Sequence, residues 1–165
     1  MASKVEIDLT QLKAVRDGLT KLCESDWDAT VREISKEVAK QFLNRVKKKT
    51  PVGVVPKGID DETYQQYWAG YHGGTLRRRW SVLPVEKQGN EYVVTIINNS
   101  KYASYVEYGH RQEPGRFVPQ LGKRLKASWV EGKFMMRITE QEIEQLMPHM
   151  VEKHIEKKLR EVFNP

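Results

Sequence analysis

The residues that could support acid–base or metal chemistry are few, and they are scattered along the chain. The four histidines are His72, His110, His149 and His154. His149 and His154 are five residues apart, which does not match the four-residue spacing of a zinc-binding histidine pair on one helix. Glu107 and His110 could form the acid–base pair of a nuclease, or they could simply border a turn. We favour the turn, because the sequence contains no HExxH, P-loop or GxSxG motif; we expect no catalysis, cofactor or metal.

Cys23 is the only cysteine in the 165 residues. It excludes an intramolecular disulfide and a multi-cysteine metal site, and it is typical of a protein made in a reducing cytosol. A reactive thiol is one interpretation, but its place beside Leu22, at the end of an apolar stripe, predicts a small buried residue. No apolar run approaches the ~20 residues of a membrane helix, and the N-terminus lacks the apolar core of a secretion signal. We therefore expect no membrane partner.

The charge balance is moderately basic, with 28 Lys and Arg against 22 Asp and Glu and a net charge of +6. Such a balance fits contact with nucleic acid or an acidic protein, and it is also common among ordinary proteins. Aromatic residues interleaved with arginine could stack on bases and contact phosphates. For Trp80, which lies on a strand-like segment, a position in the core or in an interface is favoured. The candidates are Arg77, Arg78, Arg79, Trp80, Tyr102, Tyr105 and Arg111.

Two helices are predicted before residue 50. Apolar residues from Leu9 to Leu22 recur at three- and four-residue steps, with Asp8 as N-cap. A second helix is predicted over residues 25–49, and Pro51 ends it. At 1.5 Å per residue this helix would be ~37 Å long, longer than the ~30 Å diameter of a compact domain of this size. It either extends beyond its own core and packs on a neighbour, or lies across its own sheet.

The C-terminal part predicts one more long helix. Thr139 and Glu142 have the form of a capping box at its start, and apolar residues then follow at helical spacing to the C-terminus. Pro148 lies within that pattern and should kink or divide the helix.

The middle of the chain mixes loops with strands. Glycines and prolines predict a long loop at 52–74 with a short helical turn, and loops of this length are usually functional. The remaining predictions are an antiparallel hairpin over 75–85 and 91–98, a short helix at 102–108 ended by Gly109, a loop at 110–130 and an extended segment at 129–137.

These elements predict a single α+β domain with long N- and C-terminal helices packed on a small antiparallel sheet and long interaction loops. Its parts are a helical arm at 1–49, a loop at 50–74, a sheet with a short helix at 75–137, and a C-terminal helix at 138–165.

Several ordered motifs resemble a known family. They are TPVG at 50–53, GTLRRRW at 74–80, NNSKYASYVEYGHR at 98–111 and GKFMM at 132–136. In this order they are similar to the neck and minor tail protein family of tailed phages, over about residues 45–165. Residues 54–73 stand where that family commonly has only a few residues, so the resemblance leaves the geometry of this loop open. The segment could be a docking element specific to one kind of particle.

The resemblance implies a structural subunit without catalysis, located in the neck of a virion or phage-tail-like particle and in the host cytoplasm before assembly. It implies a ring, hexameric to match the tail, between a connector or head-closure protein and a tail-terminator or tail-tube protein, with DNA passing through the channel. The alternative is a basic DNA-binding module acting outside a particle. The expected contact residues are Arg77, Arg78, Arg79, Trp80, Tyr102, Tyr105, Glu107, Tyr108, His110 and Arg111.

Overall fold

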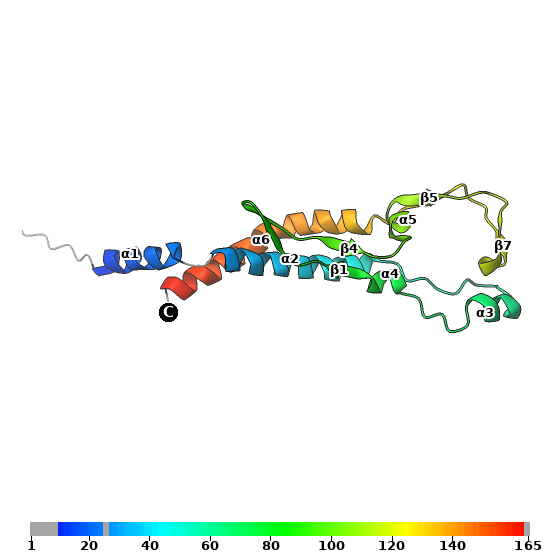
Figure 1. The fold of residues 1–165 in the computed structure, drawn as a ribbon, viewed down its shortest axis with the longest axis horizontal. Helices are drawn as coiled ribbons and strands as arrows, with labels where there is room; N and C mark the ends of the chain where they lie inside the picture. The colour runs from blue at the N-terminus through cyan, green and yellow to red at the C-terminus, as the bar shows by residue number, and fades with distance from the viewer. Residues whose placement is uncertain (1–9, 25–26, 164–165) are drawn as a thin grey trace, which may run out of the picture.

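Two long antiparallel helices form the axis of the molecule. The computed structural model describes residues 10–24 and 27–163. Within it, α2 (Trp27–Lys49) packs along α6 (Met135–Phe163), and both run the length of an elongated body (Figure 1). The predicted α+β class is confirmed, as is the end of α2 before Pro51. The predicted Asp8 cap lies outside the described residues.

The start of α6 differs from the prediction. The helix begins at Met135, so Thr139 is not an N-cap but lies one turn inside, fully buried, where its hydroxyl donates to the Met135 carbonyl oxygen at 2.7 Å. Residues 135–137 are therefore helical rather than extended. Pro148 does not divide the helix, which continues to Phe163 and bends near the middle of its length (Figure 1).

An interrupted antiparallel hairpin lies against the helices. β1 (Trp80–Val82) pairs with β4 (Ile96–Asn98), and β2 (Glu86–Gln88) pairs with β3 (Glu91–Val93). The hairpin prediction is confirmed from residue 80 onward. The prediction of a strand from residue 75 is wrong, because α4 (Thr75–Arg78) is a helical turn. It begins after Gly74, whose φ of 72° suits glycine.

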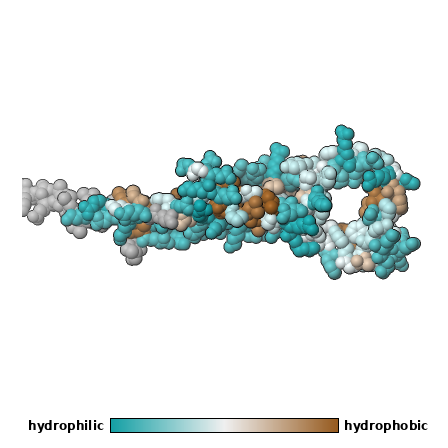
Figure 2. Space-filling model, in the orientation of Figure 1, coloured by the Kyte–Doolittle hydropathy of each residue, from teal (hydrophilic) through white to brown (hydrophobic). Residues whose placement is uncertain are grey.

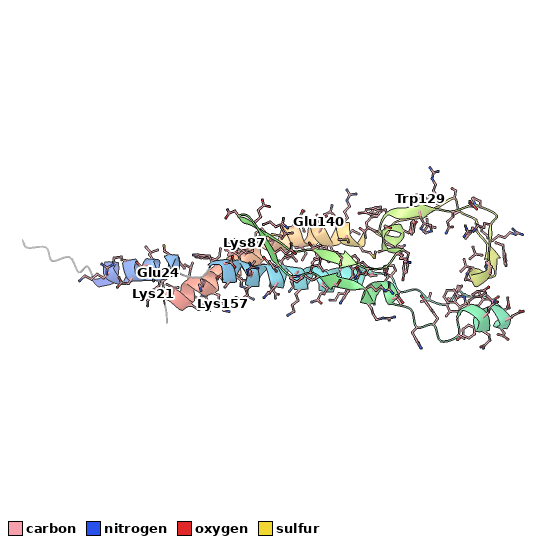
Figure 3. All side chains as sticks on the ribbon, viewed as in Figure 1. Lys21, Glu24, Lys87, Trp129, Glu140 and Lys157 are labelled. Atoms are coloured by element: carbon pink, nitrogen blue, oxygen red, sulfur yellow. The ribbon has the colours of Figure 1, made fainter. Side chains whose placement is uncertain are left out.

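Asp28, at the start of α2, bonds this hairpin to the helix. Its carboxylate accepts hydrogen bonds from the Tyr92 hydroxyl, from Arg32 Nε at 2.6 Å and from Lys87 Nζ at 2.9 Å. Tyr92 and Lys87 lie on β3 and β2, so one carboxylate connects both strands to the helix, and Figure 3 shows Lys87 on the hairpin.

The most buried apolar cluster lies at one end of the body rather than at its centre. Val46 of α2, Leu76 of α4, Trp80 of β1 and Met135 of α6 form it, each no more than 4% exposed. Partly buried side chains from α2, β4, α5 (Ala103–Tyr108) and α6 surround them. We call this end of the body, where α2 ends and α6 begins, the junction.

Two arms extend from the junction. Arm 1 is residues 51–74 and contains α3 (Asp61–Tyr67), which confirms the short helix predicted there. Arm 2 is residues 109–134, a two-stranded ribbon; a loop was predicted over 110–130, and the extended segment predicted from 129 is confirmed by the last strand of this arm. Its strands are β5 (Gly109–Arg111) paired with β8 (Trp129–Glu131), and β6 (Phe117–Val118) paired with β7 (Lys123–Arg124), with the 3₁₀ turn η1 (Pro119–Leu121) at the tip.

The arms meet only at their tips. Trp68 Nε1 donates to the Gln120 carbonyl oxygen at 2.6 Å, and Lys123 Nζ donates to the Lys57 carbonyl oxygen at 3.0 Å. Between these contacts and the junction, the space-filling view shows an opening (Figure 2). The arms therefore form a closed handle.

At the opposite end of the body, α1 (Thr10–Cys23) packs on the last turns of α6. Gly18 is buried there, and a Cβ at this position would lie 2.2 Å from the Phe163 ring. Cys23 is exposed. The prediction that it is buried is therefore wrong, because the covered face of α1 is the one that carries Gly18.

Candidate interaction surface

The TPVG and GTLRRRW motifs meet at Thr50. The Thr50 hydroxyl accepts a hydrogen bond from Trp80 Nε1 at 2.7 Å and donates to the Val46 carbonyl oxygen at 2.6 Å. The Thr50 carbonyl oxygen accepts from Arg77 Nη2 at 2.7 Å and Nε at 3.2 Å. Threonine and tryptophan are both buried, so their polar groups need partners inside the protein. These motif residues join the end of α2 to α4 and β1.

The YVEYG motif meets GKFMM at Glu107. This carboxylate is 5% exposed and accepts from the backbone N–H of Met136 through both oxygens at 3.1 Å, and from that of Arg137 at 3.3 Å. The first N–H groups of a helix have no partner within it and carry the positive end of the helix dipole. Glu107 is thus the N-terminal cap of α6.

Trp80 and Glu107 were both predicted as contact residues. Because the chain's own core and helix cap bury them, their side chains cannot reach a partner in this conformation. We remove these two from the proposed contact surface.

The three arginines at 77–79 do not form one patch. Arg77 is bonded to Thr50, and Arg79 Nη1 donates to the Asn99 carbonyl oxygen at 3.3 Å. Arg78 is exposed, and its side chain forms no hydrogen bond or ion pair with the described residues. Of the three arginine side chains, only that of Arg78 is therefore without a bond to the described part of the chain.

A second group of predicted residues lies together at the root of arm 2. Tyr105 and Tyr108 of α5 are 58% and 65% exposed, and the Tyr105 ring meets the His110 ring edge-on at 5.8 Å between centroids. β5 places Arg111 opposite Trp129, which is 48% exposed (Figure 3). Tyr102, at the start of α5, is also exposed. Large stiff aromatics of this kind are enriched in interface hot spots.

Sequence reasoning missed Trp129 and Phe117, which are exposed on arm 2. Alternation of apolar and polar residues could have indicated a ribbon, but its strands are only two or three residues long. Such short strands give no periodic signal.

Neither arm has a core of its own. Both lie wholly within the described part of the chain, and Gly73 is the only residue in them that is buried. Close backbone contacts fix their roots: a Cβ at Gly73 would lie 2.3 Å from the Gly53 carbonyl oxygen, and one at Gly132 would lie 2.3 Å from the Glu107 carbonyl oxygen.

The two arms carry opposite charge. Arm 1 has three acidic residues at 60–62 against Lys57, a net charge of −2 with His72 neutral. Arm 2 has six Lys and Arg against two Glu, a net charge of +4. No ion pair among the described residues involves either arm. The charges of both arms are thus left unpaired within the chain.

Concave surfaces among the described residues include one on arm 2 and one between the long helices. A hollow of about 260 Å³ on arm 2 combines arginine with aliphatic side chains. A groove of about 960 Å³ between α2 and the second half of α6 is lined mainly by charged side chains of both signs. The hollow's lining is His110, Arg111, Gln112, Arg116, Val118, Leu121 and Leu125.

In the described residues no three or more His, Cys, Asp or Glu gather as a metal site would require. No described helix is long and apolar enough to cross a membrane.

Comparison with known proteins identifies the family. The family model described as "Bacteriophage HK97-gp10, putative tail-component" matches residues 13–109, more than half of the chain. The match spans α1, α2, arm 1, the hairpin and α5, and ends at Gly109, where arm 2 begins. No curated protein and no solved structure matches the chain. From this match, and from the motifs that meet at its junction, the chain belongs to the HK97-gp10-like family of phage tail components.

Proposed function

We propose that the chain is a structural, non-catalytic subunit of the head–tail neck, where copies form a ring, hexameric to match the tail. The ring would contact a connector or head-closure protein on one side and a tail-terminator or tail-tube protein on the other. The subunit would be made in the host cytoplasm and enter the particle on assembly.

The observation that carries this proposal is the exposed surface of the chain. A compact monomer of 19.2 kDa exposes roughly 8,400 Å², whereas this chain exposes 12,789 Å². Large apolar side chains on α5, α6 and both arms are more than a third exposed. Such a surface is typical of a subunit whose neighbours complete its burial. Head-to-tail closure of a ring also needs two different patches per subunit, and the two arms differ in charge.

Electron microscopy of intact particles tests the location. Gold-labelled antibody against the chain should mark the neck of the particle, where head meets tail, and particles made without the gene should lack density there. Label distributed along the tail shaft, or no label on particles, would exclude the neck. The purified chain alone should be monomeric or weakly associated, because the neighbouring proteins contribute part of the interface.

The basic charge of arm 2, together with exposed Phe117 and Trp129, favours one alternative, a DNA-binding module that acts outside a particle. This alternative predicts an affinity that falls steeply with salt, with a slope of log K against log[salt] of roughly −0.9 per phosphate contacted. No binding to duplex or single-stranded DNA at low salt would exclude it.

A further inference from the structure

We infer that neighbouring copies join by their arms, with acidic arm 1 of one copy docking on basic arm 2 of the next. The inference rests on the proposed ring and specifies the surfaces that would close it. Its two halves are the exposed carboxylates Asp61 and Glu62 on α3, and the hollow with Arg111 and Arg116 on arm 2.

The side chains of these four residues have no partner among the described residues. Asp60 caps α3 by accepting from the Thr63 N–H at 2.8 Å, and Arg124 donates to the Gly115 carbonyl oxygen at 2.7 Å, so both have local roles. Asp61, Glu62, Arg111 and Arg116 form no side-chain hydrogen bond or ion pair with the described residues.

The two arms of one copy are in contact with each other. Their tips meet through side-chain donors and backbone carbonyl oxygens, not through opposite charges. The contact between the tips therefore leaves these acidic and basic side chains without partners among the described residues, and both sets are available to another copy. Opposite charge on two separate patches steers association and suppresses wrong pairings.

The shape and chemistry of the two surfaces also favour the pairing. α3 is a short projecting helix that carries Tyr64 and Tyr67, each about 40% exposed, beside its carboxylates. The hollow on arm 2 has Leu121 and Leu125 beside its arginines, and Figure 2 shows hydrophobic residues next to the opening on that arm. Tyrosine in an apolar hollow, with carboxylates on arginine at its edge, matches the apolar centre and polar rim of protein interfaces.

A second copy fits these surfaces better than nucleic acid does. DNA lying on arm 2 would meet the three acidic residues of arm 1 at the shared tip. Both arms also extend from the same end of the body (Figure 1), so in a ring they would lie at the same height and could meet their neighbours.

Charge reversal tests the pairing. D61K/E62K reverses the charge of α3 and changes the net charge of arm 1 from −2 to +2, and R111E/R116E reverses the charge of the hollow and changes the net charge of arm 2 from +4 to 0. Each variant alone should weaken self-association by at least about tenfold, as measured by sedimentation at concentrations high enough to drive the weak association of the wild-type chain. A wild-type chain that stays monomeric at every concentration would also overturn the inference. An equimolar mixture of the two variants should recover self-association, because each variant then meets the opposite charge. A variant that carries all four substitutions should self-associate without a second variant. E86K/E91K on the exposed hairpin changes the net charge as D61K/E62K does and should have no effect.

Carbodiimide coupling of isotopically light and heavy copies provides a direct measurement. It should join Asp61 or Glu62 of one copy to Lys123 or Lys126 of another. Circular dichroism of each variant checks that the fold is kept. The inference is overturned if self-association is unchanged by either reversal, if mixing fails to restore it, or if R111E/R116E abolishes only DNA binding.

The outcomes also separate this inference from the proposed function. Label at the neck without arm-to-arm coupling would retain the function and reject the contact. Arm-to-arm coupling in a chain absent from the neck would retain the contact and reject the proposed function.

Discussion

At the junction, polar side chains are buried and bonded inside the chain, whereas the charged side chains of the arms are exposed and form no ion pair with the described residues. Thr50, Trp80 and Glu107 are each buried and each bonded to a segment distant in sequence. In the arms, the side chains of Asp61 and Arg116 are exposed and form no hydrogen bond or ion pair with the described residues, and no non-glycine residue is buried. The TPVG, GTLRRRW, YVEYG and GKFMM motifs meet at the junction. They therefore specify how the fold is held together, while the arms carry the surface available to partners.

The largest expected difference between the junction and the arms is in the free energy with which their amides open to hydrogen exchange. Junction amides such as that of Thr50, bonded to the Val46 carbonyl oxygen, should open only with global unfolding. Arm amides should open with a free energy lower by about 5 kcal/mol, since no side chain there is buried. Arm protection equal to that of the junction in the isolated chain would contradict the comparison, and protection that appears only in assembled particles would sharpen it.

Two aromatic residues from the same motif set give the next largest contrast. Trp80→Ala leaves a cavity in the junction core and removes the bond to Thr50, so the free energy of unfolding should fall by about 3–5 kcal/mol. Tyr108→Ala, 65% exposed, should change it by less than about 0.5 kcal/mol. Denaturant titration measures both. Assembly into particles should then fail for Tyr108→Ala despite its normal stability.

The cap of α6 should show a smaller effect. Glu107→Gln keeps one acceptor oxygen but loses the negative charge at the helix N-terminus, so stability should fall by about 1–2 kcal/mol. Glu131→Gln, on the exposed strand β8, is the matched control and should be neutral. A neutral Glu107→Gln would mean that charge at this cap contributes nothing.

Sequence periodicity predicted α1, α2, α5 and the body of α6, because helical spacing and terminators such as Pro51 are local signals. The start of α6 was missed for a physical reason. The residues at 139–142 look like a local capping box, but the true cap, Glu107, comes from 28 residues before Met135 and is brought there only by the fold. Local patterns cannot reveal a cap contributed by a distant segment.

The candidate site was predicted less completely than the fold. Three consecutive arginines looked like one basic patch, yet the turn of α4 sends Arg77 to Thr50 and Arg79 to Asn99. The exposed tyrosines of α5 were predicted as a contact surface and stay a prediction. Burial of Trp80 and Glu107 depends on long-range packing, so residue type alone could not distinguish them from Tyr105 or Tyr108.

The smallest predicted effect is a pH dependence in the body, at Asp28. Hydrogen bonds from Tyr92, Arg32 and Lys87, in that order, hold the pKa of this carboxyl well below its usual range. A carboxyl with a lowered folded pKa stabilises the fold fully above its unfolded pKa of about 4, and that contribution is lost as the pH falls below it. Asp28→Asn should therefore reduce the slope of stability against pH in acid. Asp61→Asn in arm 1, where the carboxylate has no partner among the described residues, should leave that slope unchanged, and equal slopes for wild type and Asp28→Asn would show that the hairpin is held by its backbone and apolar contacts instead.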